Sequence, residues 1–435
     1  MNSVLRREAQ DYPIALRAVT AMFQIMCKSD DGHVVGSTAS DGRNKEGLQS
    51  VVTSHRMSAW LNLFRWMAAL AVVITHVNNR LLVPFAAVPH DDRSLLLYGW
   101  TFLAGFAHQA VMIFFVLSGF LVGGTLLLEV QATGNADLKG YFIKRLSRLY
   151  VVVLPALILG YALDHAGITL TSGRTDFYPT QVIAALAPSV FACNVFFLQT
   201  IECVQFGSNG ALWSLANEFW YYVLWPLLLA PFMTQRILLH RIIMVVTGLG
   251  IGAWLSTAKY ATFPIVPYML PWIIGVIPIF RRTPIIGRTP RRAILLFFGI
   301  LLTIRLGVRG VTWEAYPVVC YILDIIVSLS FSNMLSSLRS EQLARPLPWN
   351  AFHRWAADFS YSLYTVHTPV ITALGAMLLS CFGVGWKMQP STHLAWALTI
   401  SYLMCAIACA YGFSLLTEVH TGKVRHLLIT CLRRK

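Results

Sequence analysis

Charged residues are scarce in this sequence. Only 12% of its 435 residues are Asp, Glu, Lys or Arg, whereas 56% are hydrophobic and the mean hydropathy is +0.61. Soluble domains usually contain about 25% charged residues. The composition therefore excludes an ordinary soluble protein and predicts an all-α fold, a polytopic bundle of transmembrane helices.

Acidic residues are the scarcer kind of charge. There are 19 Asp and Glu against 34 Lys and Arg, which gives a formal net charge of +15. The basic residues are not gathered in one amphipathic block but flank apolar runs. We therefore assign the excess to membrane topology, with membrane lipid as a partner, and expect no nucleic-acid partner.

Metal-type cysteine spacing and internal repeats are also missing. The eight cysteines include no CxxC pair and lie mostly in apolar runs, where a thiol behaves as a small apolar residue. We predict no metal site and no disulfide framework. Cys193 and Cys203 form the one pair expected near the outer surface, where a single bridge can form. Without a repeat, nothing indicates the inverted halves common in transporters.

Three regions are distinguished by composition. Residues 1–57 mix charges, Gly and Ser without the apolar core of a secretory signal, which predicts a mostly disordered cytoplasmic extension. Residues 58–420 form the predicted transmembrane domain. Residues 421–435 form a basic cytoplasmic tail.

Apolar runs of about 15 to 25 residues predict the membrane spans. An eleventh run, 182–198, contains Pro188 and Asn194, and making it a span would place the basic clusters near residues 281–292 and 425–435 outside, against the positive-inside rule. We therefore predict about ten spans, both termini in the cytoplasm and one long external segment, 164–211. The ten are 58–79, 105–128, 149–163, 212–233, 242–258, 261–280, 293–308, 314–335, 358–381 and 393–417.

The first span contains two ionisable residues, Arg65 and His76. They are eleven residues apart, so they share one helix face at a separation of roughly 16 Å along the axis. Ionisable groups inside a bilayer usually mark function. The alternative is that Arg65 reaches the cytoplasmic headgroups and His76 is a polar anchor at the outer interface.

Two arginines precede the third predicted span in the segment KRLSRLY. Arg145 and Arg148 are three residues apart, on one side of a helical turn at the inner face. A guanidinium suits phosphate recognition, and nucleotide-bearing donors reside in the cytosol. The alternative is that both residues only set topology and touch anionic lipid.

Two further residues are candidates for proton chemistry. Glu218, in LWSLANEFWYYVLW, is expected at a depth similar to that of His76, where a carboxylate can orient an imidazole. The alternative is a structural partner between helices. His367, in FSYSLYTVHTPV, competes with His76 as a base, but its predicted place near the bilayer centre favours a buried, hydrogen-bonded histidine.

These stretches together resemble the acyltransferase 3 family of bacterial integral-membrane O-acyltransferases. The shared features are an Arg, ten residues and a His in the first helix, RxxR after the second, and WSLxxE followed by aromatics. FFVLSGFL at 114–121, in which Ser118 and Gly119 permit close helix approach, NVFFLQ at 194–199 and FSYSLYTVHTPV also match. The sequence departs from the family where Glu418 is followed by Val and His instead of Arg and Pro.

The resemblance implies an O-acyltransferase of the bacterial inner membrane, with acetyl as the expected group. It would move the group from cytosolic acyl-CoA, a co-substrate rather than a tightly bound cofactor, to a hydroxyl of an extracytoplasmic sugar, polysaccharide or lipid-linked sugar. The catalytic residues would be His76 as general base, Glu218, which would hold its tautomer, and Arg65, which would contact the donor or offset local negative charge. Arg145 and Arg148 would bind the donor together with Arg65. The predicted substrate-binding residues are Ser214, Trp213, Asn194 and His367.

Other functions fit some of the same residues. A transporter or flippase for a glycan or acyl group could use the intramembrane charges as a proton relay. The other large family of membrane-bound O-acyltransferases has an intramembrane His with an upstream Asn, a pattern that this sequence does not follow. A scaffold would need no chemistry. The acceptor, direct transfer against an acyl-enzyme, and the oligomeric state stay open.

Overall fold

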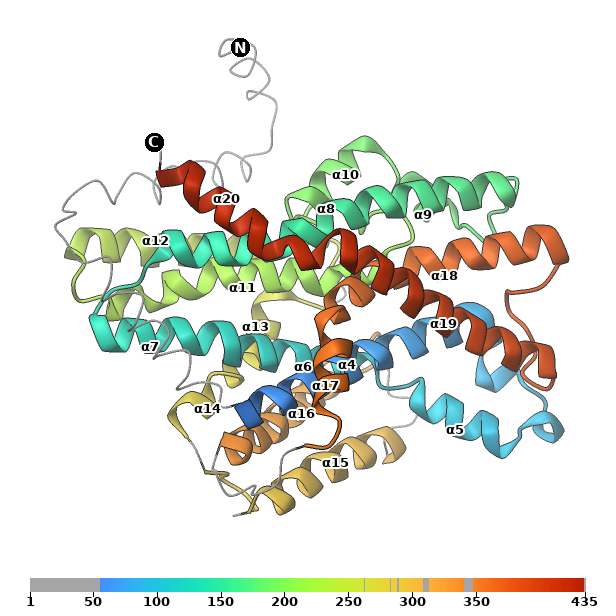
Figure 1. Ribbon diagram of the computed structural model, residues 1–435, viewed down its shortest axis with the longest axis horizontal. Coiled ribbons are helices and arrows are strands. Elements are labelled where there is room, and N and C mark those ends of the chain that lie inside the picture. The colour runs from blue at the N-terminus through green and yellow to red at the C-terminus, as the bar shows by residue number, and fades with distance from the viewer. Residues whose placement is uncertain are drawn as a thin grey trace, which may run out of the picture.

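A computed structural model describes residues 55–433 apart from 262, 282, 288, 308–312 and 340–346. All regular elements in this part of the chain are helical, with no β-strand, so the predicted all-α fold is confirmed (Figure 1). The longer helices are α4 (His55–Leu81), α5 (Leu95–Leu103), α6 (Ala107–Ser118), α7 (Gly124–Thr133), α8 (Leu138–Leu170), α10 (Pro188–Val195), α11 (Trp213–Leu229), α12 (Leu238–Leu255), α13 (Ile265–Ile274), α15 (Pro290–Gly307), α16 (Pro317–Arg339), α17 (Asn350–Asp358), α18 (Ser360–Phe382), α19 (His393–Leu416) and α20 (Thr421–Arg433). The short ones are η1 (Phe85–Ala87), η2 (His90–Asp92), η3 (Gly119–Gly123), α9 (Thr180–Ala184), η4 (Gly210–Leu212), η5 (Ala230–Phe232), α14 (Ile277–Phe280) and η6 (Glu418–His420).

Each of the ten predicted spans overlaps a helix of the structure. Among the described residues, seven helical stretches are long and apolar enough to cross a membrane, which supports a multi-pass membrane protein. The number of crossings and the side on which the termini lie stay predictions. The seven stretches are Met57–Leu81, Leu95–Thr133, Leu138–Leu170, Leu238–Leu255, Pro317–Arg339, Ser360–Phe382 and His393–Cys431.

Helix α8 is much longer than the predicted 149–163. Its 33 residues extend roughly 50 Å, against about 30 Å for the hydrocarbon core of a bilayer. The helix begins where the Asp137 carboxylate accepts a hydrogen bond from Gly140 N (2.8 Å), directly after Gly134 ends α7 in a left-handed conformation. The basic residues expected in a loop are therefore helical. One continuous helix therefore contains Arg145 near its start and Asp164 near its end.

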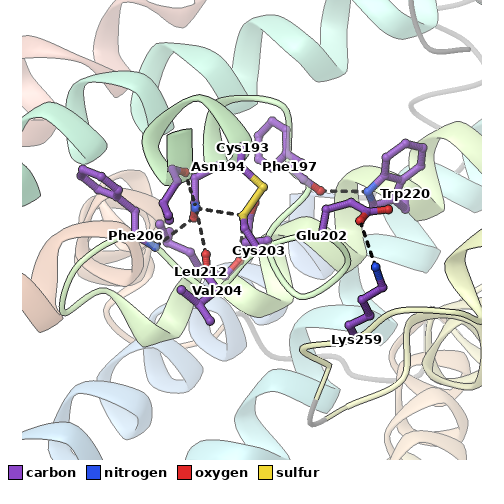
Figure 2. The surroundings of a disulfide bond; sticks show 12 residues. Cys193, Asn194, Phe197, Glu202, Cys203, Val204, Phe206, Leu212, Trp220 and Lys259 are labelled. Carbon is purple, nitrogen blue, oxygen red and sulfur yellow. Dashed lines mark hydrogen bonds and ion pairs between the residues drawn. A yellow bond between two sulfur atoms is a disulfide. The ribbon is translucent and has the colours of Figure 1, made fainter. Parts of the chain in front are cut away.

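The segment between α8 and α11 contains three short helices, α9, α10 and η4. With three to eight residues, none is long enough to span a bilayer, so the eleventh apolar run, 182–198, is not one continuous helix. A disulfide joins Cys193 to Cys203 (Figure 2). The loop that it closes turns inward, because Phe197 and Ile201 are buried in the main core.

Helix α4 is the centre of the bundle. It packs against α6, α17, α18 and α19, and α18 packs in turn against α8 and α19 (Figure 1). The face of α4 with Arg65 and His76 is therefore enclosed by protein along its length. Beyond the bundle, α20 packs against α8, so the predicted basic tail is largely a docked helix. The predicted N-terminal extension lies outside the described residues up to residue 54.

Helices α6 and α13 approach each other through glycine. A Cβ atom at Gly119 would overlap the carbonyl oxygen of Trp272, and one at Gly275 would overlap that of Val116. The adjacent Ser118 accepts a hydrogen bond from Trp272 Nε1 (3.0 Å). The prediction that Ser118 and Gly119 permit close helix approach is confirmed.

Candidate active site

The first part of the site is a cavity of about 100 Å³ that we call the arginine cavity. Its polar lining includes Arg65 of α4, Arg145 and Arg148 of α8, and Glu218 of α11. Tyr222 and Tyr364 also line it. Because Arg148 is exposed, the cavity reaches the surface at that end.

Positive charge exceeds negative charge among the residues that line the arginine cavity. Within the described residues, Arg65, Arg145 and Arg148 form no ion pair with a carboxylate, and Arg145 Nε is buried with no hydrogen-bond partner. The one carboxylate of the cavity, Glu218, accepts a short hydrogen bond from the Tyr222 hydroxyl. Three guanidinium groups against one carboxylate make the cavity suited to an anion with several charges.

The second part is a cavity of about 230 Å³ that we call the histidine cavity. It is lined by His76 and Arg80 of α4, Tyr178 and Ser208 of the segment before α11, and Thr368 of α18. His76 forms no hydrogen bond with any residue that the structure describes. Its imidazole is therefore available to exchange a proton with a ligand in this cavity.

Two side chains of α18 stand between the cavities. The ring of His367 lies 5.0 Å from that of His76 and 6.0 Å from that of Tyr364, measured between centroids. Tyr364 lines the arginine cavity, and its hydroxyl is 2.6 Å from Ser214 Oγ. A continuous series of polar side chains thus connects the two cavities.

His367 differs from His76 in that both of its ring nitrogens have partners. Nδ1 lies 3.0 Å from the carbonyl oxygen of Leu363, and Nε2 lies 3.1 Å from Thr368 Oγ1. A carbonyl only accepts, which assigns the proton of a neutral ring to Nδ1 and makes Nε2 the acceptor. His367 is buried and held in place, so the geometry favours His76 as the group that moves a proton.

The structure brings the predicted donor-binding arginines together in one cavity, but it places Glu218 and His76 in different cavities. Arg65, Arg145 and Arg148 line one cavity, as contact with a single donor requires, and the predicted substrate-binding residue Ser214 lines it as well. Glu218 lines that cavity too, not the one with His76, and its carboxylate accepts a hydrogen bond from Tyr222, so it does not contact His76 as its predicted role requires. The expected similarity of depth stays a prediction.

Two predicted substrate-binding residues have structural contacts. Asn194 is fully buried, and its side chain bonds the backbone of Val190, Val204 and Phe206 (2.9–3.1 Å), which holds the disulfide loop together (Figure 2). The Trp213 ring packs against that of Phe263, with centroids 4.6 Å apart. Substrate contact by either residue stays a prediction.

Glu418, the residue at the departure from the family pattern, binds no arginine in the described structure. Its carboxylate accepts hydrogen bonds from Ser362 N (3.1 Å) and Ser362 Oγ (2.8 Å). The contact ties the end of α19 to the start of α18, next to Tyr361 of the arginine cavity.

Arg80 and Ser208 were not predicted from the sequence, and Tyr178 was expected only as one of several polar and aromatic residues of the external segment. Arg80 follows His76 by four residues, a spacing that places both on one helix face and was available from the sequence. No comparable signal exists for Tyr178 and Ser208, because only the fold brings residues of the external segment next to α4.

Comparison with known proteins establishes the family of the chain. The sequence profile of the family described as acyltransferase domain (acyltransferase 3) matches residues 58–418. The chain belongs to this family, and the resemblance stated from its motifs is confirmed. No solved structure matches the chain.

Three curated relatives illustrate the similarity. Peptidoglycan O-acetyltransferase OatA of Listeria monocytogenes is 25% identical over 338 residues, which cover 71% of this chain and 48% of the relative. A putative O-acetyltransferase of Staphylococcus aureus is 27% identical over 195 residues, which cover 44% of this chain and 28% of the relative. An uncharacterized protein of Haemophilus influenzae is 32% identical over 121 residues, covering 27% and 47%. The chain thus spans less than half the length of each.

Proposed function

We propose that this chain is a membrane O-acetyltransferase that moves an acetyl group from cytosolic acetyl-CoA to a hydroxyl of an extracytoplasmic sugar. The observation that supports it best is the free imidazole of His76, which is linked through His367 and Tyr364 to a cavity with three unmatched arginines. Family membership and the names of the relatives agree with this chemistry. A peptidoglycan acceptor, the substrate in the name of the Listeria relative, is one candidate.

The arginine cavity is the proposed donor side. Acetyl-CoA bears several phosphate charges, and Arg65, Arg145 and Arg148 offer guanidinium groups without carboxylate partners. The exposed Arg148 marks the entrance, which faces the cytosol under the predicted orientation. The pantetheine arm would then extend past Tyr364 toward His76.

The histidine cavity is the proposed acceptor side. His76 takes the proton of the sugar hydroxyl while the hydroxyl oxygen attacks the thioester carbonyl. The carbon–oxygen bond forms, the carbon–sulfur bond breaks, and the proton passes from His76 to the leaving CoA thiolate. General base catalysis of this kind is typically worth about 10²- to 10⁴-fold in rate. Glu218, on the donor side, sets the charge of the arginine cavity rather than the tautomer of His76.

One assay tests this function against the transporter alternative. Full-length protein in proteoliposomes is given acetyl-CoA on the side of the basic loops, and CoA release and acetyl esters on added sugar are measured. The proposal predicts equal amounts of both products. Movement of sugar or acetyl-CoA across the bilayer without CoA release would instead identify a transporter.

A further inference from the structure

Arg80 has an unusual position beside the proposed base. It projects from α4 on the same face as His76, and its guanidinium carbon lies 4.0 Å from the centroid of the Phe177 ring. Nη2 donates to the carbonyl oxygen of Phe177 (3.2 Å). Nε, by contrast, is buried and has no partner among the described residues.

Other polar atoms next to Arg80 are also buried without a partner. They are the Tyr178 hydroxyl and Ser208 Oγ, both from residues that line the histidine cavity, and Asp164 Oδ1 behind them. Folded proteins leave few such groups, because each costs free energy when it is removed from water without a hydrogen bond. Four of them around one cavity, contributed by α4, α8 and two parts of the external segment, indicate a place for a polar ligand.

The backbone near Ser208 is arranged to support this cluster. Asp164 Oδ2 accepts a hydrogen bond from Ser208 N (2.7 Å). The preceding Gly207 has a φ of +57° and lies against the Asp164 carboxylate, where a Cβ atom would not fit. The turn therefore requires glycine, and it holds the Ser208 hydroxyl at the cavity.

The free groups define the chemical class of the ligand. Arg80 offers a donor, Asp164 an acceptor, and the hydroxyls of Tyr178 and Ser208 can do either. An anion would be repelled by Asp164 and a cation by Arg80, whereas a neutral hydroxyl both donates and accepts. Phe177 also lines the cavity, but its ring is buried beneath the Arg80 guanidinium, so the polar groups alone define the ligand class.

We propose that Arg80, Tyr178 and Ser208, supported by Asp164, form a cradle that binds hydroxyl groups of a neutral sugar and positions the acceptor at His76. The assignment rests on the proposed function, since it concerns the acceptor of the same transfer. Within that function, Arg80 and its neighbours determine acceptor affinity and take no part in donor binding.

The test measures acceptor kinetics of the full-length protein in nanodiscs at saturating acetyl-CoA. The probes are chitotetraose and maltotetraose, which are neutral, and polygalacturonate, which is acidic. CoA release is followed with a thiol reagent and acetyl esters by mass spectrometry. Wild type is expected to use a neutral probe better than the acidic one. Arg80→Gln is expected to raise the acceptor KM by about 10-fold or more, and Tyr178→Phe by about 2- to 10-fold, with the acetyl-CoA KM unchanged.

Arg93→Gln is the matched control. Arg93 also binds a carbonyl oxygen, that of Val88 (3.0 Å), and also stacks on a phenylalanine, Phe85 (4.8 Å), but it lines neither cavity. Its acceptor KM should equal that of wild type. Tyr178→Phe removes only an unpartnered hydroxyl, so its thermal stability without sugar should not fall, whereas a purely structural hydroxyl would lower it.

The outcomes separate the cradle from the function. If Arg80→Gln and Tyr178→Phe both acetylate sugar with an unchanged acceptor KM, the cradle is overturned and the proposed function is kept. The same holds if wild type prefers polygalacturonate to the neutral probes. CoA release without acetylated sugar overturns the cradle but retains thioester chemistry. If wild type neither releases CoA nor acetylates sugar, the proposed function itself is overturned. If Arg80→Gln fails to accumulate, Tyr178→Phe and Ser208→Ala replace it. A raised acceptor KM in these two variants supports the cradle, and an unchanged one overturns it.

Discussion

The arginine cavity and the histidine cavity share helix α4 but present opposite kinds of polarity. In the arginine cavity one sign of charge dominates, and its single carboxylate is bound by Tyr222. In the histidine cavity donors and acceptors are mixed around one guanidinium, and several of them have no partner. The first environment suits a polyanion and the second a neutral polyol, so one helix can serve two unlike substrates.

Removing His76 should produce the largest difference between the cavities. His76→Ala is expected to lower transfer to sugar by about 10²- to 10⁴-fold, because the proton acceptor is lost, while acetyl-CoA still binds in the arginine cavity. CoA release and equilibrium binding of acetyl-CoA measure the two effects. His393→Ala, an exposed histidine at the start of α19, is the control. Full transfer by His76→Ala would rule out this base.

Opening the disulfide should destabilise the segment between α8 and α11. Replacing Cys193 and Cys203 by Ser is expected to lower stability by about 2 to 4 kcal/mol, the usual range for a native disulfide. Thermal inactivation reports the change, with Cys381→Ser, an exposed free thiol, as the control. Since disulfides persist in oxidising compartments, both thiols should react with maleimide only after reduction. Ready labelling in unreduced cells would contradict the external placement of this segment.

Changing the arginines should affect only the donor. Arg145→Ala with Arg148→Ala is expected to raise the acetyl-CoA KM by about 10- to 100-fold, because hydrogen bonds between charged groups are lost. The acceptor KM should not move. Lys144→Ala, an exposed cation on the same turn of α8 that does not line the cavity, is the matched control. Equal effects of Lys144→Ala and the arginine variants would indicate nonspecific charge.

Glu218→Gln gives a smaller effect with an informative sign. Removing the carboxylate makes the arginine cavity more positive, so the acetyl-CoA KM should fall, by about 2- to 5-fold for a single charge in a partly solvated site. If Glu218 instead oriented His76, transfer would drop and its pH profile would shift. The two readouts, KM for acetyl-CoA and the pH dependence of transfer, therefore decide between the two roles.

The smallest effect is expected at a surface ion pair above the histidine cavity. Arg174 Nη2 lies 2.7 Å from Asp176 Oδ2, and this hydrogen bond lowers the pKa of Asp176 below its ordinary value of 3.8. With a lowered pKa, any stabilisation by the pair is fully present above pH 3.8 and is lost as the pH falls from there through the lowered pKa of the folded state. Because both groups are exposed, Asp176→Asn should leave thermal inactivation at pH 7 unchanged. A clear loss at pH 7 would contradict this.

Hydropathy was sufficient to predict a helix at each of the ten spans, but it did not predict where these helices begin and end. All ten predicted spans have a helical counterpart, since a bilayer imposes long apolar runs. The start of α8 was missed by eleven residues because lysines and arginines were assigned to a loop, although both residues favour helices. Basic residues next to an apolar run indicate on which side of the membrane that end of the helix lies, but they do not indicate at which residue the helix begins.

Local motifs predicted the donor side better than the acceptor side. Arg65, Arg145 and Arg148 follow from spacing within helices, and they do meet in one cavity. Tyr178 and Ser208 come from an irregular segment whose path depends on packing between distant residues, which one sequence does not reveal. The same cause led to the prediction that Glu218 contacts His76, because nothing local indicates that Glu218 bonds Tyr222 and lines the other cavity.

The side chains of Tyr364 and His367 between the cavities have a consequence for the cell's energy supply. An enzyme that meets one substrate from each side of a membrane risks becoming an ion pore. Each elementary charge that leaks across 100 mV dissipates about 2.3 kcal/mol. Here the rings of Phe114, Tyr364 and His367 pack between the two water-accessible spaces, with Phe114 and Tyr364 centroids 5.7 Å apart. We expect cells producing this protein to keep their membrane potential, because these packed rings separate the two spaces and, under the proposed function, only the thioester arm would pass between them.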